Sequence, residues 1–496
     1  MNVRELLKIL PSVEFREGSD QTVRVLCFDT RNLSPGCVFV AIRGTKIDGH
    51  QFLVEAMQKG ALALVVEDLT AVPAEFRGTI AVVPSTRVAL NQLASKYFGD
   101  PAQKLFCVGV TGTNGKTTTT YMIESIFSQG RRPAGVIGTI DHHFKDQVWK
   151  TEMTTPDPVS LQSRLREFAD LGAKSLAIEV SSHALRQNRV DEIPFDCAVF
   201  TNLSRDHLDY HTDMDDYFDA KNRLFRDLLS NSKRAKPTAI INADDEYGKK
   251  IQVGSNVRLW YYGMNSGAHL RYSIQTSGFS GTRFSLATPV GHRDFSIRMV
   301  GAHNVANAVA AIGAGLSAEL SMDAIAQALG TLNGVSGRLE AVPNTKEIHV
   351  FVDYAHTPDA LTTVLHYLNK IRTDSRIKNK IITVFGCGGD RDTGKRPLMM
   401  KAAIASSDFV VLTSDNPRTE NPEKILDDAQ AGAPAAALGK TLFREVDRRL
   451  GIKKALELAN EGDVVLIAGK GHEDYQQVGT VRHPFSDFTV VKELLK

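Results

Sequence analysis

The most constraining feature of this 496-residue sequence is a glycine-rich segment between an apolar strand and a helix. The apolar run at residues 105–110 predicts a buried strand, and the sequence TGTNGKT follows it directly at 111–117. A helix is expected to begin at once and to end near Gln129, before Gly130. Glycines let backbone N–H groups approach phosphate oxygens, and a helix N-terminus adds a favourable dipole. This context favours a nucleoside triphosphate site over a glycine-rich turn of no catalytic use.

Two side chains at the start of the expected helix would complete the phosphate site. Lys116 would reach the terminal phosphates, and the Thr117 hydroxyl can ligate Mg²⁺. The spacing is GxxGKT rather than the general GxxxxGKT, because Val110 stands where the first glycine belongs. The motif predicts nucleotide binding and does not by itself identify the reaction.

Composition sets the broad class of the chain. About 150 residues per domain predicts three domains, and 42% hydrophobic with 23% charged residues excludes a largely disordered chain. A net charge of +2 gives no general reason to bind nucleic acid or an anionic membrane. No apolar run approaches the roughly 18 residues that cross a bilayer, and the charged start MNVRELLKIL predicts a helix rather than a signal peptide. Five scattered cysteines without a CxxC pair predict neither a disulfide framework nor a zinc site. A soluble, reducing compartment fits these observations, so we expect a cytoplasmic protein without nucleic-acid binding or membrane insertion. We also expect a monomer, although the sequence does not fix the oligomeric state.

Strand and helix patterns divide the chain into three expected α/β domains, at 1–101, 102–335 and 336–496. The middle region alternates buried strands with amphipathic helices, which predicts a mostly parallel sheet. The last region predicts a doubly wound fold, whose ligands bind beyond the carboxyl ends of the strands. The expected strands are 23–29, 38–42 and 62–66 in the first region, 105–110, 175–180, 197–202 and 239–242 in the second, and 349–353, 380–385, 409–413 and 463–468 in the third.

Polar side chains follow two of the middle strands. Glu179 ends one strand near the phosphate loop, where a Mg²⁺ ligand is expected, although a strand-end charge facing solvent is the alternative. The next strand is followed by Asp206, His207, Asp209 and His211. Each of them could simply cap the next helix, but the cluster as a whole is typical of a loop that can bind a metal.

Lys221 lies on the apolar side of the helical stretch 215–229. It is four residues after Tyr217 and three before Leu224, so it shares their face of the helix. A surface lysine that extends its ammonium to water is one interpretation. The other is a lysine of lowered pKa near the phosphate site, which can react as a free amine.

These motifs together resemble the Mur ligase family, over almost the whole chain and in the family's order. Three further segments resemble in particular the members that add diaminopimelate. The motifs are GTNGKTT at 112–118, EVSSHAL at 179–185, NLSRDHLDYH at 202–211, AK at 220–221, GAHNVANA at 301–308, GRLE at 337–340 and DYAHTPDAL at 353–361, and the three segments are GCGGDRDTGKRP at 386–397, DNPRTENP at 415–422 and AGKGHEDYQ at 468–476.

The resemblance implies a UDP-binding N-terminal domain, a central ATPase domain and a C-terminal Rossmann-like domain. It implies an ATP-dependent ligase that adds meso-diaminopimelate to UDP-N-acetylmuramoyl-L-alanyl-D-glutamate through an acyl phosphate. That reaction belongs to cytoplasmic peptidoglycan synthesis, and so to cell wall biogenesis, cell shape and cell division. Positioning and charge neutralisation would supply most of the catalysis.

The resemblance also assigns residues to roles. Lys116, Glu179, His207 and Lys221 would be catalytic, with Mg²⁺ held by Thr117, Glu179, His207 and by Lys221 as its carbamate, N6-carboxylysine. The residues implied for ATP are Gly112, Thr113, Asn114, Gly115, Lys116, Thr117, Thr118, Asn304, Asn307, Arg338 and Asp353. Those implied for the UDP substrate are Thr30, Thr154, Thr155, Ser181, Gln187 and Arg189, and solvated loop positions are the alternative for Thr30 and Gln187.

The acceptor residues follow strands of the last region. The resemblance implies that Arg418 grips the distal carboxylate of diaminopimelate while Glu473 receives the distal amine. An arginine fork meets a carboxylate with two hydrogen bonds, and lysine-adding relatives depart at this position. A surface arginine in a turn is the alternative for Arg418. The implied acceptor residues are Arg391, Asp415, Asn416, Pro417, Arg418, Gly469 and Glu473.

Three other functions compete with this interpretation. A sister ligase could add L-lysine, and a folylpolyglutamate synthase would share the phosphate loop but lack the DNPR and GHEDYQ segments. A nucleotide-dependent switch or kinase would form no amide. ADP release that requires both the acceptor peptide and the amino acid would indicate a ligase. ADP release without the amino acid would favour a switch or kinase.

Overall fold

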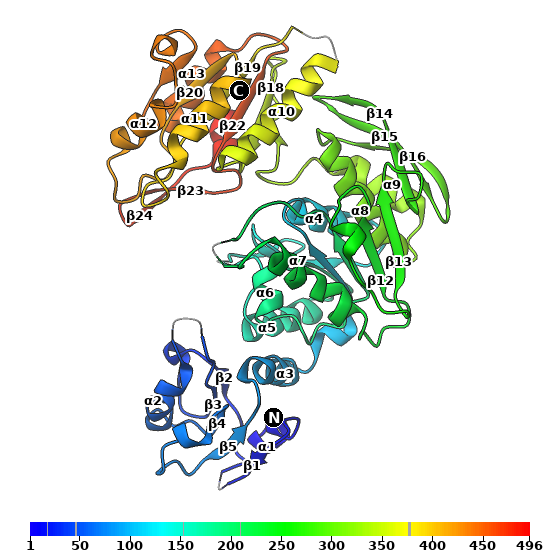
Figure 1. The fold of residues 1–496 in the computed structure, drawn as a ribbon, viewed down its shortest axis with the longest axis vertical. Helices are drawn as coiled ribbons and strands as arrows, with labels where there is room; N and C mark the ends of the chain where they lie inside the picture. Colours follow the sequence, from blue (N-terminus) through cyan, green and yellow to red (C-terminus); the bar gives the residue numbers. More distant parts are fainter. Residues whose placement is uncertain (17, 45–46, 152, 209, 375–377) are drawn as a thin grey trace. The chain divides into compact units, whose positions relative to one another are not determined.

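Strands that alternate with helices build most of this chain, as Figure 1 shows. The structure is a computed structural model that describes residues 1–16, 18–44, 47–151, 153–208, 210–374 and 378–496. The chain divides into two units. Unit 1 comprises Met1–Arg271, Ala287–Gly291 and Asn307–Ile325, and unit 2 comprises Tyr272–Leu286, His292–Ala306 and Ala326–Lys496. The three domains expected from the sequence stay a prediction.

The first part of unit 1 is a five-stranded sheet of order β1-β5-β4-β3-β2. Strands β2 to β5 run parallel, and β1 pairs antiparallel with β5. Side chains alternate along each strand, so Val38 and Val40 face α1 and α3 while Phe39 faces α2. The three strands predicted here are present. The elements are α1 Val3–Leu7, β1 Val13–Glu14, β2 Val25–Cys27, η1 Thr30–Asn32, β3 Cys37–Val40, η2 Gly49–Phe52, α2 Leu53–Gln58, β4 Ala63–Val66, η3 Leu69–Ala71, β5 Thr79–Val82 and α3 Thr86–Phe98.

The second part of unit 1 is a mostly parallel sheet with β6 at its centre. β6 lies between β10 and β11 and runs parallel to both. Because the carboxyl ends of parallel strands meet at one edge, the segments after these three strands come together there. The strands predicted in this region are confirmed. The elements are η4 Pro101–Lys104, β6 Phe106–Thr111, α4 Lys116–Gln129, β7 Ala134–Ile137, β8 His142–Phe144, β9 Gln147–Trp149, α5 Pro158–Asp170, β10 Ser175–Glu179, α6 Ser182–Arg186, β11 Cys197–Phe200, α7 Met214–Arg223, η5 Leu224–Leu229, β12 Thr238–Asn242, η6 Gly248–Lys250 and β13 Arg258–Gly263.

Two details of this region differ from the sequence expectation. The helical stretch at 215–229 is an α-helix only to Arg223, and a π-helical turn, η5, continues it. Strands β14 to β16 were not predicted from the sequence. The residues of β15 nevertheless alternate in burial, as in a half-buried strand. These strands and the two helices after them are β14 Leu270–Gly278, β15 Gly281–Thr288, β16 Gly291–Ile297, α8 Ala302–Ser317 and α9 Met322–Thr331.

The C-terminal part of unit 2 is a six-stranded sheet of order β17-β18-β22-β19-β20-β21, with all strands except β17 parallel. Its two faces carry separate hydrophobic clusters: α10, α11 and α12 cover one, and α13 and α14 cover the other. The predicted doubly wound pattern is confirmed. The elements are β17 Glu340–Ala341, β18 His349–Asp353, α10 Pro358–Asp374, β19 Ile381–Phe385, α11 Lys395–Ser406, β20 Phe409–Leu412, α12 Pro422–Gln430, η7 Ala435–Ala437, β21 Leu442–Arg444, α13 Arg448–Leu458, β22 Val464–Ala468, β23 Tyr475–Val478, β24 Val481–Pro484 and α14 Asp487–Leu494.

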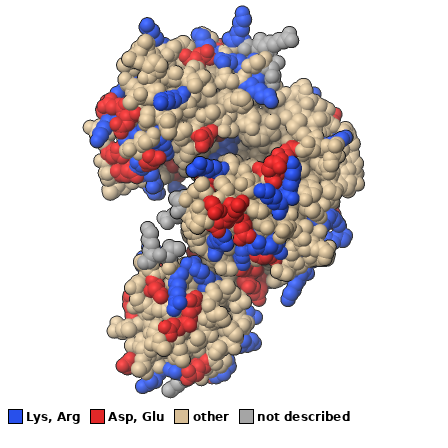
Figure 2. Space-filling model, viewed as in Figure 1, with Lys and Arg blue, Asp and Glu red and all other residues tan. Residues whose placement is uncertain are grey.

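Charges of both signs are spread over the surface. Figure 2 shows Lys and Arg side chains intermixed with Asp and Glu side chains on the visible face. Within the described ranges, no helix combines the length and the apolar character needed to cross a membrane. All five cysteines are buried free thiols.

A buried ion pair supports the carboxyl edge of the C-terminal sheet. The Arg448 guanidinium donates two hydrogen bonds of 2.7 Å to the Asp487 carboxylate, and neither side chain is exposed. Its remaining N–H groups donate to the carbonyls of Ala468 (3.0 Å) and Ser414 (3.3 Å). One guanidinium therefore fixes the ends of two strands immediately before the predicted acceptor residues.

We expect Arg448→Met to lower the free energy of unfolding of unit 2 by about 3–5 kcal/mol, because it leaves the Asp487 carboxylate buried without its cation. Arg449→Met is the matched control, since Arg449 pairs with Glu493 at the surface and should contribute less than about 1 kcal/mol. Urea unfolding followed by circular dichroism measures both. Equal losses in the two variants would contradict the structural role of Arg448.

Candidate active site

The glycine-rich segment lies at the carboxyl end of β6 and leads directly into α4. Gly112 has φ +144° and Gly115 has φ +86°, a region that other residues rarely adopt. A Cβ atom at Gly112 would collide with Thr201 Oγ1, and one at Gly115 would collide with Asn307 Oδ1. Glycine is therefore required at both positions by conformation and by space.

Neighbouring residues after β11 hold this phosphate loop in shape. The Thr113 N–H donates to the Asn202 carbonyl at 2.8 Å, and the Asn114 N–H donates to Asn202 Oδ1 at 3.0 Å. The Thr201 hydroxyl donates to the Asn114 carbonyl at 2.6 Å. The loop is thus preorganised at the N-terminus of α4, the arrangement that binds phosphate.

Lys221 is buried directly against the phosphate loop. Its side chain is 2% exposed, and its Nζ donates to the Gly112 carbonyl at 2.9 Å. The same carbonyl accepts from Lys116 Nζ at 2.9 Å, and Lys116 also donates to the Thr113 carbonyl at 2.8 Å. The Lys221 Nζ lies 4.5 Å from the centre of the Tyr217 ring.

Burial and the nearby Lys116 ammonium together lower the pKa of Lys221 well below its usual range, while Asp206 opposes them. A neutral amine is therefore accessible at this position. Only a neutral amine adds carbon dioxide, so the environment suits the predicted carbamate. The alternative of a lysine that extends to water does not agree with its burial.

Glu179 is fully buried at the end of β10, so it does not face solvent. Its carboxylate accepts hydrogen bonds from the Thr139 N–H at 2.9 Å and the Thr139 hydroxyl at 3.0 Å. The carbonyl of Glu179 accepts from the Thr155 hydroxyl at 2.7 Å. Because β10 is the parallel neighbour of β6, Glu179 lies at the same sheet edge as the phosphate loop.

The histidines after β11 have two different environments. His207 has φ +53° and a side chain 44% exposed, and its backbone N–H donates to Asp206 Oδ1. His211 is buried, with Nδ1 3.1 Å from Asp216 Oδ2 and Nε2 2.9 Å from Ser182 Oγ. His211 therefore connects α6 to α7, whereas His207 stays accessible. Asp209 lies outside the described residues.

A cavity of about 430 Å³ in unit 1 contains part of the predicted UDP-substrate site. Gln187 and Arg189 line it, and Arg189 donates to Gln187 Oε1 (2.7 Å) and to the Thr155 carbonyl (2.7 Å). Burial lowers the pKa of Arg189. Thr30 is not among the lining residues, but its neighbours Asp29 and Arg31 are.

The remaining predicted substrate residues link this region to Glu179. The Thr155 hydroxyl lies 3.3 Å from Ser181 Oγ, and Ser181 caps α6 by accepting from the Ala184 N–H. The Thr154 hydroxyl lies 3.0 Å from the Thr139 hydroxyl, which in turn donates to Glu179. A chain of hydroxyl groups therefore joins the predicted substrate residues to the predicted metal ligand.

The other predicted ATP residues are divided between the units. Asn307 belongs to unit 1 and contacts the phosphate loop at Gly115. In unit 2, Asp353 accepts from the backbone N–H groups of Leu339 and Ala355, both at 2.7 Å. Burial raises the pKa of Asp353, and Arg338 opposes that shift. Asn304 is buried and donates to the Val300 carbonyl at 2.8 Å.

The predicted acceptor residues gather at the carboxyl edge of the C-terminal sheet, called the acceptor edge below. Arg418 has φ +52°, and its Nη1 donates to the Gly389 carbonyl at 2.7 Å. A Cβ on Gly388 would lie 3.0 Å from Arg418 Nη1 and 3.8 Å from Arg391 Cγ, so both arginines flank this glycine. The Gly389 N–H donates to the Asn416 carbonyl, which brings the loops after β19 and β20 together.

Lys470 is the functional candidate that the sequence analysis missed. It is fully buried, and its Nζ lies 2.9 Å from Glu473 Oε2, 3.2 Å from Asn416 Oδ1 and 3.5 Å from Asp415 Oδ1. The sequence signal was its place between Gly469 and Gly471, immediately after a buried strand. It completes a network of charged and amide groups at the acceptor edge.

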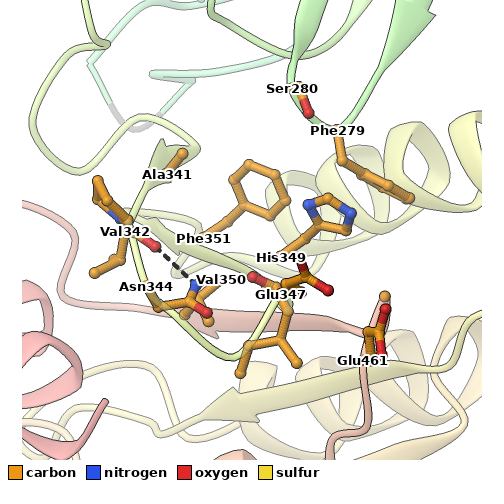
Figure 3. A pocket seen from close by; sticks show the side chains of 13 residues that line it. Phe279, Ser280, Ala341, Val342, Asn344, Glu347, His349, Val350, Phe351 and Glu461 are labelled. Atoms are coloured by element: carbon orange, nitrogen blue, oxygen red, sulfur yellow. Dashed lines mark hydrogen bonds between the residues drawn. The ribbon is translucent and has the colours of Figure 1, made fainter. Parts of the chain in front are cut away.

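A second cavity, of about 520 Å³, lies in unit 2 at the amino end of β18, away from the acceptor edge. Figure 3 shows the rings of Phe279 and His349 beside each other, and their centres are 4.8 Å apart. None of the predicted site residues lines this cavity.

The fold and the phosphate loop define a nucleotide-binding α/β protein. Residues 22–98 match the family description "Mur ligase family, catalytic domain", residues 110–315 match "Mur ligase middle domain", and residues 337–471 match "Mur ligase, glutamate ligase domain". The chain belongs to the Mur ligase family.

Relatives and a solved structure resemble the whole chain. The UDP-N-acetylmuramoyl-L-alanyl-D-glutamate--2,6-diaminopimelate ligase of Geobacter metallireducens is 41% identical, with 98% of this chain and 97% of the relative covered. The ligase of the same name from Aquifex aeolicus is 43% identical, with 95% and 94% covered. A solved structure of a ligase with this name has a TM-score of 0.73 and 33% identity, with 100% of this chain and 99% of that chain covered.

We expect carbon-13 bicarbonate to give a carbamate signal in the carbon NMR spectrum of the wild-type protein, because burial and Lys116 lower the pKa of the Lys221 amine. Lys221→Arg should remove the signal. Lys250→Arg is the matched control and should keep it, since Lys250 is exposed. A signal of equal strength in all three proteins would place the carbamate elsewhere.

Proposed function

We propose that this chain uses ATP to join meso-diaminopimelate to the glutamyl carboxylate of UDP-N-acetylmuramoyl-L-alanyl-D-glutamate, as a cytoplasmic monomer in peptidoglycan precursor synthesis. The observation that carries this proposal is the acceptor edge, where Arg418 and Arg391 lie beside one glycine and Glu473 belongs to the adjoining polar network. Such an edge offers separate groups to a carboxylate and to an amine. The phosphate loop supports the ATP-dependent half of the reaction.

The first chemical step takes place at the phosphate loop. The glutamyl carboxylate oxygen attacks the γ-phosphorus of ATP, the bond to the bridging oxygen breaks, and ADP leaves. Lys116 and the N-terminus of α4 neutralise the negative charge that spreads over the phosphate oxygens. The product is an acyl phosphate whose carbonyl carbon can be attacked.

Mg²⁺ fits part of the donor set. The Thr117 hydroxyl and the Glu179 carboxylate are oxygen donors, which Mg²⁺ prefers. Lys221 offers oxygen only as its carbamate, and His207 offers a nitrogen. No three His, Cys, Asp or Glu side chains among the described residues form a metal cluster, so the carbamate would supply a missing anionic ligand. When bound, Mg²⁺ would neutralise the phosphate charge.

The second chemical step joins the acceptor. The amine nitrogen of diaminopimelate attacks the acyl carbonyl carbon to give a tetrahedral intermediate. The nitrogen loses a proton to solvent, the bond between the carbonyl carbon and the phosphate oxygen breaks, and the amide forms as phosphate leaves. Arg418 would bind the distal carboxylate through two parallel N–H groups, and Glu473 would accept from the distal ammonium. L-lysine has no distal carboxylate, so it could not use Arg418.

The UDP substrate would bind in the cavity beside Arg189. Its charged guanidinium and the amide of Gln187 suit diphosphate and sugar oxygens. Thr154, Thr155 and Ser181 continue from this cavity toward Glu179 through the hydroxyl chain described above. The peptide end of the substrate would follow that path to the phosphate loop.

We expect purified protein to release ADP and phosphate only when ATP, UDP-N-acetylmuramoyl-L-alanyl-D-glutamate and meso-diaminopimelate are all present. The coupled products are an amide and one phosphate per ADP, measured by mass spectrometry and phosphate release. Use of L-lysine in preference would favour the sister ligase, and use of a folate with glutamate would favour the folylpolyglutamate synthase. ATP hydrolysis at the same rate with and without the amino acid would favour a switch or kinase.

We expect Arg418→Ala to weaken acceptor binding by about 1.5–3 kcal/mol, the range for a hydrogen bond to a charged group. The change should appear in the KM for meso-diaminopimelate and leave the KM values for ATP and the UDP substrate near those of the wild type. Arg449→Ala, at an exposed pair on α13, is the control. Unchanged diaminopimelate kinetics in Arg418→Ala would disprove the assignment.

A further inference from the structure

We propose that Lys470 determines which amino acid the acceptor edge takes, because its buried ammonium neutralises and positions Glu473. The edge then favours an acceptor that carries a carboxylate beside its distal amine over one that carries a bare ammonium. This inference rests on the proposed function and concerns the same site.

The position of Lys470 is fixed from several sides. Its Nζ donates to Glu473 Oε2 at 2.9 Å and to Asn416 Oδ1 at 3.2 Å, and it lies 5.4 Å from the centre of the Tyr475 ring. Gly469, immediately before it, has φ +113°, and a Cβ there would lie 3.1 Å from Asp415 Oδ2. The ammonium is thus enclosed beside the acceptor residues and has no exposed surface.

Glu473 is held by two donors on one oxygen. Besides Lys470, the Asn416 amide donates to the same Oε2 atom at 2.9 Å. Asn416 is itself fixed, since its Oδ1 accepts from the Gln477 N–H at 2.8 Å. The hydrogen bonds from Lys470 and Asn416 both end on Glu473 Oε2. They fix the orientation of the carboxylate and do not involve Oε1.

The charges at this edge explain the expected selectivity. Lys470 faces two carboxylates, Glu473 at 2.9 Å and Asp415 at 3.5 Å, and Arg418 and Arg391 flank Gly388 in the adjoining loop. Asp390 and Glu420 contact the same loop, and Arg396 pairs with Glu420. The buried pair of Arg448 and Asp487 beneath them adds no net charge. A bare distal ammonium therefore meets a Glu473 carboxylate that is already paired with the Lys470 ammonium at 2.9 Å, so its attraction to Glu473 is offset.

A distal centre that carries both an ammonium and a carboxylate is electrically neutral. It gains hydrogen bonds from Arg418 and from Glu473 without adding charge to the edge. Lys470 therefore acts through Glu473 and touches no reacting atom, which makes it a positioning residue that sets specificity. Without its ammonium, Glu473 would regain its full attraction for a bare ammonium.

The test compares kcat/KM for meso-diaminopimelate and for L-lysine in the wild type and in Lys470→Met, with ATP and the UDP substrate saturating. Met has a similar length and no charge. We expect the preference for meso-diaminopimelate to fall by about tenfold or more. Lys453→Met, an exposed lysine on α13, should keep the wild-type preference.

If Lys470→Met lowers kcat/KM by the same factor for both amino acids, the ratio of the two values is unchanged. Lys470 would then have a purely structural role, and the inference would be overturned. Thermal unfolding shows whether Lys470→Met is folded. If it is not, the double variant Lys470→Met with Glu473→Gln, which removes both charges, is compared with Glu473→Gln alone. Equal ratios in these two proteins support action through Glu473, and different ratios overturn it. A wild type that ligates neither amino acid instead disproves the proposed function.

Discussion

Two lysine side chains donate to one backbone carbonyl, that of Gly112, and the chemistry that we propose for unit 1 depends on this contact. The phosphate loop supplies the carbonyl, α4 supplies Lys116, and α7 supplies Lys221 from the other side. Two ammonium groups this close repel each other, and burial penalises the charge on Lys221 further. Both effects lower the pKa of Lys221 and make the uncharged amine more accessible, which is the form that can become a carbamate.

Parallel sheets bring the other parts of the site together. Strands β6, β10 and β11 end at one edge, so the phosphate loop, Glu179 and the segment that holds His207 meet there without being close in sequence. The same rule places Asp415 and Gly469 at one edge in unit 2, where Arg448 fixes the carbonyls before them. Each unit thus prepares one half of the proposed reaction: an activated carboxylate in unit 1 and a bound amine in unit 2.

The features that the sequence predicted well are those whose signal is local. The strand, glycine loop and helix around Lys116 are contiguous. The apolar face of α7 already included Lys221, although the sequence left open whether its amine extends to water or is buried. Strands β14 to β16 and the π-helical turn after Arg223 were missed, because weak alternation and a change of helix type depend on what packs against them. Lys470 was missed for a similar reason: it lies next to Gly469, but its role follows from Asn416, which is 54 residues away. His211 stood in a cluster of metal-capable residues, and only the structure shows that Asp216 and Ser182 already engage its ring.

Amide formation by Lys221→Ala, measured with and without acetate, tests the role of the Lys221 carbamate most directly. We predict that Lys221→Ala forms no amide without acetate. Acetate is a small carboxylate that can occupy the place of the carbamate, so it should restore part of the activity. Acetate should leave Lys250→Ala, altered at an exposed lysine, at the wild-type rate. Full activity of Lys221→Ala without acetate would contradict the claim that the buried amine beside Gly112 is converted to the anion on which the reaction depends.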